Sequence, residues 1–156
     1  EVPGLFGRPV PLQNLLRVRV FDSWTHLQDI RRAAGLPGDL ATPGAQVSAL
    51  QMANAQAFVL SRNVEAPIGT TLRVTVTGPV ALERWSVVDE EGRGVDLDAL
   101  ARPAEPTIGL TTDWETYARL GAGRLDVSDP GVLARLDLTG DEQLAAKLPE
   151  SLAVTP

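Results

Sequence analysis

The sequence predicts an α+β protein in which two long helices precede a segment of strands and short helices. Two observations carry this prediction. Apolar residues recur at helical spacing through residues 11–34 and again through residues 42–61. Residues 70–77, TTLRVTVT, alternate instead with a period of two and are rich in β-branched side chains, which is typical of a strand. The change of period near residues 62–69 marks the boundary between two parts of the chain.

The first helix is expected to begin at Pro11, because proline suits a first turn, and to end before Gly35 and Pro37. The second is expected to begin at Thr42, a suitable N-cap residue. Both helices carry apolar residues on most of their faces, as helices packed between other helices do. Because two such helices cannot bury each other alone, we expect an N-terminal segment or a second chain to complete a helical bundle around them.

The rest of the chain is expected to form the α+β part. Strands are expected at residues 70–77, 81–89, 107–111 and 134–138, a tight loop at 90–94, and helices at 114–120 and 141–148. Asp113 precedes the first of these helices and is expected to cap it. The predicted domains are therefore residues 1–65, helical, and residues 66–156, α+β.

Composition narrows the classes of function. The 156 residues include 14 Lys and Arg against 20 Asp and Glu, and the net charge of -6 argues against a nucleic-acid-binding protein. The chain has no cysteine, which fits a reducing compartment, and we expect it to be cytoplasmic. No apolar run approaches the ~18 residues of a membrane span. The chain begins with Glu1 rather than Met, and its first nine residues read like a loop, so we expect a fragment or one half of a split enzyme.

The one histidine of the chain, His26, lies between two acidic residues at helical spacing. Asp22 precedes it by four positions and Asp29 follows it by three, so the three share a helix face about 60° wide. Apolar residues, among them Leu12 and Ile30, lie on or beside that face, so we expect it to be buried. Buried charge must be paired or bound to metal. Two interpretations stay open: His26 is a core histidine held by a carboxylate, or His26 and Asp22 are ligands of a divalent metal such as zinc.

Two charged neighbours of His26 also have alternative roles. Arg19 either contacts a carboxylate of a bound ligand, as a cofactor-binding residue, or neutralises Asp22. Asp29 either accepts a hydrogen bond from the second ring nitrogen of His26 or pairs with a neighbouring arginine on the helix surface. The sequence patterns of phosphate-binding loops and of a nucleophile elbow do not occur.

These residues resemble the mycothiol-dependent maleylpyruvate isomerase family. The run RVFDSWTHLQDIRRAAGLPG, residues 19–38, is similar to the family's metal-binding segment, in which arginine, an acidic residue, tryptophan, histidine and Asp-Ile-Arg follow in this order. FGRPVPL at 6–12 resembles the family's lead-in. TTDWETYARLGAGR at 111–124, LDLTGDEQLAAKL at 136–148 and the ending LAVTP resemble its small C-terminal domain. The resemblance covers nearly the whole chain, as the C-terminal part of a family member.

The resemblance implies a fold and a chemistry. The fold is the last helices of a DinB-like four-helix bundle, followed by a small α/β domain similar to sterol carrier proteins. The metal, usually zinc, takes a histidine from an early helix that precedes this part of the family pattern, and a carboxylate and a histidine that match Asp22 and His26. It is thought to activate the thiol of mycothiol, because a divalent cation lowers the pKa of a thiol and holds the thiolate as nucleophile. Arg124 matches an arginine implicated in catalysis; its alternative role is an ion pair with Asp113 or Asp126 that holds the domain together.

Three functions follow as hypotheses. The first is the C-terminal portion of a metal- and mycothiol-dependent isomerase or thiol transferase, whose thiolate adds to the double bond of a small substrate such as maleylpyruvate, allows rotation, and leaves. The second is a non-catalytic module that binds a hydrophobic ligand in a deep apolar pocket within residues 70–156 and keeps only a vestigial metal site. The third is an assembly module whose apolar helices dimerise or receive a partner.

Overall fold

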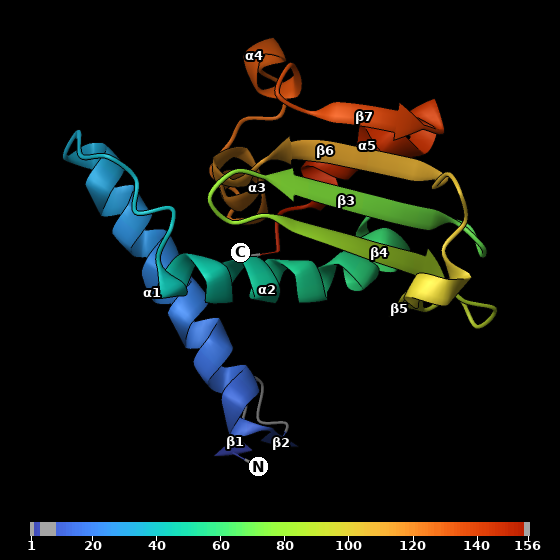
Figure 1. Ribbon diagram of the computed structural model, residues 1–156, viewed down its shortest axis with the longest axis horizontal. Helices are drawn as coiled ribbons and strands as arrows, with labels where there is room; N and C mark the ends of the chain where they lie inside the picture. The colour runs from blue at the N-terminus through green and yellow to red at the C-terminus, as the bar shows by residue number, and fades with distance from the viewer. Residues whose placement is uncertain (1, 4–8, 155–156) are drawn as a thin grey trace. The chain divides into compact units, whose positions relative to one another are not determined.

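The structure is a computed structural model that describes residues 2–3 and 9–154. The chain divides into two compact units, residues 1–51 and 52–156, and the division falls within helix α2 (Figure 1). Residues 4–8 lie outside the described residues, and with them most of the predicted lead-in loop. The predicted boundary after residue 65 concerns domains of the whole protein and stays a prediction.

The first unit consists mainly of helix α1 (Leu12–Ala33) and the first half of α2 (Pro43–Phe58). Strands β1 (Val2–Pro3) and β2 (Pro9–Val10) pair antiparallel before α1. The bounds of α1 agree within one residue at each end with the helix predicted over residues 11–34. No helix among the described residues is long and apolar enough to cross a membrane.

The connection between the two helices runs back along α1 and is held there by side chains one turn apart. Arg31 Nε donates a hydrogen bond to the carbonyl of Pro37 at 2.7 Å. The backbone N–H of Asp39 donates to Gln28 Oε1 at 3.0 Å, and Trp24 Nε1 donates to the carbonyl of Asp39 at 3.2 Å. Residues at i, i+4 and i+7 share one helix face, so a single face of α1 fixes the path of the loop that leads to α2.

Helix α2 ends in a change of helical hydrogen bonding that the sequence did not predict. Thr42 Oγ1 accepts a hydrogen bond from Ala45 N at 3.3 Å, which confirms the predicted N-cap. The α-helix stops at Phe58, and a π-helix, η1 (Val59–Asn63), continues the chain. Glu65 follows with a positive φ of 55°, a backbone conformation that side chains other than glycine rarely adopt.

The second unit is built on one mixed sheet of five strands (Figure 1). The strands are β3 (Thr71–Thr77), β4 (Leu82–Val88), β5 (Gly94–Asp96), β6 (Ile108–Asp113) and β7 (Asp137–Gly140). Their order is β5-β4-β3-β6-β7. The central pair β3 and β6 is parallel, and every other pair is antiparallel. This arrangement confirms the α+β class.

Three α-helices belong to this unit: α3 (Trp114–Gly121), α4 (Pro130–Leu133) and α5 (Glu142–Ser151), with a 3-10 turn, η2 (Ala99–Ala101), before β6. Asp113 caps α3 as predicted, and Asp141 caps α5. Helices α3 and α5 pack against β6 and lie behind the sheet in Figure 1. The core between these layers includes the fully buried side chains Leu72, Val74, Ile108, Leu110, Trp114 and Leu148.

Two short elements differ from the sequence-based expectation. The predicted loop at 90–94 is a turn that leads directly into β5, whose three residues are too few to give a periodic signal. The strand predicted at 134–138 is shifted to Asp137–Gly140, because residues 130–133 form helix α4 and a turn follows it. The shift leaves Leu136 buried just ahead of the strand.

Candidate functional site

The predicted metal-binding face of α1 carries an imidazole between two carboxylates. His26 Nε2 lies 3.5 Å from Asp22 Oδ1, and His26 Nδ1 lies 3.7 Å from Asp29 Oδ2. These distances confirm that the three side chains share one helix face, as their spacing predicts. Each ring nitrogen therefore has its own acidic neighbour.

The expectation that this face is buried is wrong. The His26 side chain is 62% exposed, that of Asp22 49% and that of Asp29 34%. The buried residues of α1 are Phe21, Trp24, Thr25 and Gln28. They lie about 110° around the helix axis from the face that carries His26. Leu12 and Ile30, which suggested burial, are themselves exposed. The apolar residues beside His26 thus mark a helix face on which no other part of the described chain packs.

The described residues do not fit a zinc ion by themselves. Asp22 and His26 would be the ligands, and the carboxylate of Asp29 on the second ring nitrogen is a common arrangement for a metal-bound histidine. Zinc usually takes four ligands, at least three of them from protein. Among residues 2–3 and 9–154, no group of three or more His, Cys, Asp or Glu side chains is placed to hold a metal. A metal site here needs donors from outside the described residues.

The two arginines beside this face make intrahelical pairs. Arg19 Nη1 lies 4.0 Å from Asp22 Oδ2, and Arg32 Nη1 lies 4.0 Å from Asp29 Oδ1. These contacts favour the neutralising role of Arg19 over its predicted cofactor-binding role, which stays a prediction. Pairs of this length between exposed side chains contribute little to stability, about 0–1 kcal/mol.

Arg124, the predicted catalytic arginine, belongs to the C-terminal cap of α3. Its N–H donates to the carbonyl of Arg119 at 2.7 Å, and Gly123 before it has a φ of 65°. This pattern is a Schellman motif, in which a left-handed glycine closes a helix end. The Arg124 guanidinium also donates to the carbonyl of Ala122 at 2.7 Å. The contacts supply a structural role, and the catalytic role stays a prediction.

A second candidate site lies inside the second unit, between α2, α3 and the segment after α5. It is a cavity of about 10 Å³, roughly the space of one water molecule. Its lining residues are Met52, Gln56, Val59, Tyr117, Gly121, Leu152 and Val154. The deep apolar pocket predicted for residues 70–156 thus has, at this place, only a much smaller counterpart.

The polar groups near this cavity are held away from it or kept neutral. Gln56 Nε2 donates to the carbonyls of Leu72 at 3.5 Å and Arg84 at 3.2 Å, which fixes the amide against β3 and β4. Burial raises the pKa of Tyr117, and the positive charge of Arg84 opposes this shift only in part, so the phenol stays neutral. The other lining side chains are apolar, while Gln56 Oε1 is a buried acceptor that has no hydrogen-bond partner among the described residues.

Sequence reasoning missed the residues around this cavity. Met52 and Gln56 lie among the apolar and small residues of α2, where they read as ordinary helix positions. Gly121 and Val154 are far from them in the sequence, and no periodic pattern links the four. The available signal was the chain's single methionine, since methionine often fills irregular gaps in a core.

Comparisons with known proteins find similarity of structure but not of sequence family. No model of a protein family and no curated protein matches the sequence. The sterol carrier protein domain 2 of Helicoverpa armigera is similar in structure, with 20% identity over 69% of this chain and 85% of that chain and a TM-score of 0.45. Sterol carrier protein 2 of Aedes aegypti, solved with palmitate, is 14% identical over 65% of this chain and 94% of that chain, with a TM-score of 0.41.

The ubiquinone synthesis protein UbiJ-SCP2 is 14% identical over 91% of this chain and 96% of that chain, with a TM-score of 0.36. Nothing in these comparisons concerns mycothiol, a metal or isomerase activity, and these stay predictions. The chain is similar in structure to sterol carrier protein 2 domains, and no family is assigned to it.

Proposed function

We propose that the unit formed by residues 52–156 binds an apolar ligand with an alkyl chain, such as a fatty acid. The observation that supports this function is the apolar cavity between α2, α3 and the segment 152–154. Sites for small molecules are lined mainly by apolar side chains with few polar groups. The one amide on its wall, Gln56, donates to strand carbonyls through Nε2, and its Oε1 accepts no hydrogen bond from the described residues.

Binding requires the cavity to enlarge, and the segment after α5 forms one of its walls. Val154 N donates to the carbonyl of Gly121 at 3.0 Å, and Leu152 is buried. Breaking one such hydrogen bond costs about 0.5–1.5 kcal/mol net, and exposing a leucine costs about 1.5–3 kcal/mol. Burial of an alkyl chain gains about 0.8 kcal/mol per methylene. About three to six buried methylenes therefore offset the opening.

Titration of the 156-residue chain with palmitate, below the concentration at which palmitate forms micelles, tests this function. We expect saturable binding of one palmitate per chain by calorimetry. Gly121→Val places three extra carbons in the cavity wall and should weaken binding, whereas Ala146→Val, on the exposed side of α5, should not. Absence of saturable binding by the wild-type chain would reject the proposal.

A second candidate function is assembly through α1. Five large apolar side chains of this helix are between 37% and 66% exposed: Leu12, Leu16, Val20, Leu27 and Ile30. Their spacings of three, four and seven residues are typical of a helix that packs along another helix. A shallow groove lies beside this stripe and is bordered by Leu16, Val20, Trp24 and Leu27. An exposed apolar stripe of this kind is typical of an interaction surface.

Light scattering of the purified chain tests this second function. Leu16→Glu places a charge in the stripe and should shift any self-associated species to a monomer. Asn14→Glu adds the same charge to α1 on the opposite side of the helix and should leave the mass unchanged. A wild-type chain that is monomeric at all concentrations, and that co-purifies with no second polypeptide, would reject the assembly function.

A further inference from the structure

Met52 borders the proposed ligand cavity and is 3% exposed. Its terminal methyl group lies against the backbone of Gly121, so close that a Cβ on residue 121 would overlap Met52 Cε. Gly121 has no positive φ, so the backbone does not require glycine there. The residue is needed for space: the absence of a side chain at 121 makes the room that the tip of Met52 fills.

Met52 is also the lining side chain that is best able to move. It has three rotatable side-chain bonds and no polar group to anchor it. Gln56 has as many bonds but is tied to the carbonyls of Leu72 and Arg84. Tyr117 is fixed by burial and by its contact with the Trp114 ring, 6.4 Å away.

We propose that Met52 is a displaceable plug, whose side chain occupies the ligand-free site and leaves when an unbranched alkyl chain enters. This inference rests on the apolar-ligand function proposed above. A methionine side chain is itself an unbranched chain of four heavy atoms, so the space that it vacates against Gly121 has the cross-section of an alkyl chain. The plug therefore selects unbranched chains over rigid rings, because a ring is wider than the groove between Gly121 and the remaining wall.

The single methionine of the chain makes this plug directly observable. Protein labelled with ¹³C at the methionine methyl gives one methyl resonance, that of Met52. Palmitate titrated into this protein should shift the resonance in proportion to the occupancy measured by calorimetry. Its contact with the Gly121 α-protons, seen as a cross-relaxation peak, should disappear at saturation. Palmitate binding with an unchanged Met52 resonance and an unchanged Gly121 contact would overturn the plug while leaving the proposed function intact.

Two ligand classes and a pair of variants test the selection. Wild-type protein should bind palmitate and should bind 1-adamantanecarboxylate, a rigid ring acid, weakly or not at all. Met52→Ala removes the plug and should bind palmitate about tenfold more tightly, because the open state no longer has to be formed, while the ring acid should stay weak because the groove beside Gly121 is no wider. Leu110→Ala truncates a buried residue of β6 outside the cavity and should leave both affinities unchanged.

The outcomes separate the two proposals. If the wild-type chain binds no palmitate, the apolar-ligand function fails, and the plug with it. If wild type binds palmitate but Met52→Ala gains no affinity for palmitate, the plug fails alone. Where Met52→Ala is poorly folded by circular dichroism, Met52→Leu serves instead: leucine is one heavy atom shorter along the chain, so it leaves the space beside Gly121 open and should raise the affinity for palmitate in the same direction.

Discussion

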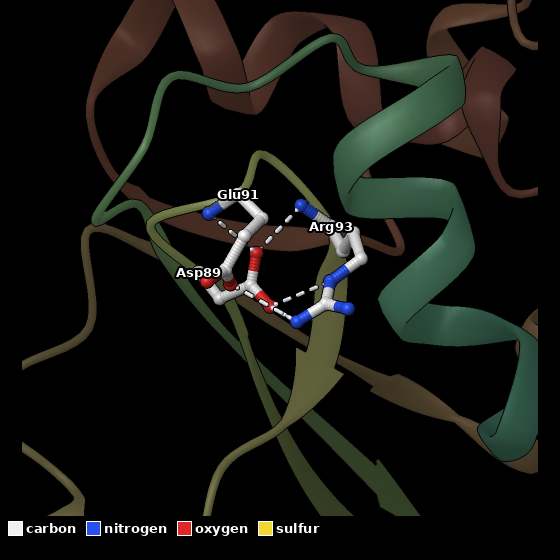
Figure 2. A network of polar contacts seen from close by, with 3 residues as sticks. All are labelled: Asp89, Glu91 and Arg93. Atoms are coloured by element: carbon white, nitrogen blue, oxygen red, sulfur yellow. Dashed lines mark hydrogen bonds and ion pairs between the residues drawn. The ribbon is translucent and has the colours of Figure 1, made fainter.

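Arg93 closes the loop between β4 and β5 by donating two hydrogen bonds to one carboxylate oxygen of Asp89, from Nε at 3.0 Å and Nη2 at 2.9 Å (Figure 2). The other oxygen of Asp89 accepts from the backbone N–H groups of Glu91 at 3.1 Å and Arg93 at 2.8 Å. The Arg93 side chain also reaches Glu91 Oε2 at 3.0 Å. One carboxylate thus organises a five-residue connection that lies at the surface.

Asp89 should make the stability of the chain depend on pH in acid. The backbone N–H of Arg93 and the Arg93 guanidinium lower the pKa of Asp89, and desolvation opposes them only in part. Because the folded pKa lies below the unfolded one, the stabilising effect is complete above about pH 4 and is lost as the pH falls through the folded pKa. Melting temperatures measured by circular dichroism from pH 7 to pH 2 should therefore fall less steeply for Asp89→Asn than for wild type.

The control for this prediction is Asp137→Asn, which changes an exposed carboxylate of the edge strand β7. Its melting curve should keep the acid dependence of the wild type. Equal acid slopes for wild type and Asp89→Asn would show that the loop carboxylate does not couple folding to pH.

Asp113 should stabilise the second unit through the cap that it makes on α3. Its Oδ1 accepts from Thr116 N at 3.0 Å, and its Oδ2 accepts from Thr116 Oγ1 at 2.6 Å, which caps α3. Partial burial raises the pKa of Asp113, but the hydrogen bonds from Thr116 outweigh it and the net shift is downward. Asp113→Ala should lower the free energy of unfolding by about 0.5–2 kcal/mol in urea denaturation at pH 7.

Asp113→Asn keeps a side-chain oxygen that can accept from Thr116 N, so it should recover most of this loss. If Asn and Ala cost the same, the hydrogen bond to the helix is not the source of the stabilisation.

Features that depend only on neighbouring residues in the sequence, such as helix caps, were predicted correctly. Features that depend on which distant residues pack against an element, such as the burial of a helix face, were not. Asp113 and Thr42 cap their helices because a side-chain acceptor before a helix needs only its own backbone. The face shared by Asp22 and His26 also followed from helical geometry alone. Its burial did not follow, because periodicity marks a face that is apolar without saying what covers it.

The cavity residues could not be predicted for a different physical reason. The space that Met52 fills exists because Gly121 lacks a side chain, and the two are brought together by packing between α2 and α3. Neither residue carries a charge, a metal ligand or a turn signal. A pair that matters only through complementary shape leaves no local pattern in a single sequence.

Glu65 should be a site at which replacement by glycine stabilises the protein. Its φ of 55° lies in the left-handed region and its side chain is exposed. A side chain there costs about 1–2 kcal/mol, while glycine loses about 0.5–1 kcal/mol through the freedom of the unfolded chain. Glu65→Gly should therefore raise the free energy of unfolding by about 0.5–1 kcal/mol. Glu65→Ala keeps the strain and should give no gain; an equal gain for both would place the effect in the glutamate charge.

Zinc binding by this chain should require metal ligands from outside the described residues. Asp22 and His26 supply one oxygen and one nitrogen at an exposed face, half of a four-coordinate site. We therefore expect the purified 156-residue chain to carry less than one equivalent of zinc after gel filtration, measured by native mass spectrometry together with metal analysis. Asp22→Ala and His26→Ala should carry the same amount as the wild type.

The isomerase hypothesis makes the opposite prediction for a complex with a further polypeptide. If a segment that carries another histidine completes the site, zinc should become stoichiometric in that complex and should be lost again in His26→Ala, while His26→Ala still forms the complex. Stoichiometric zinc on the isolated chain, lost in His26→Ala, would show that the described donors suffice and would contradict the donor argument. If His26→Ala does not change the zinc content of the isolated chain or of the complex, α1 has no function that depends on the metal. The apolar-ligand and assembly functions would then be the ones that stay open.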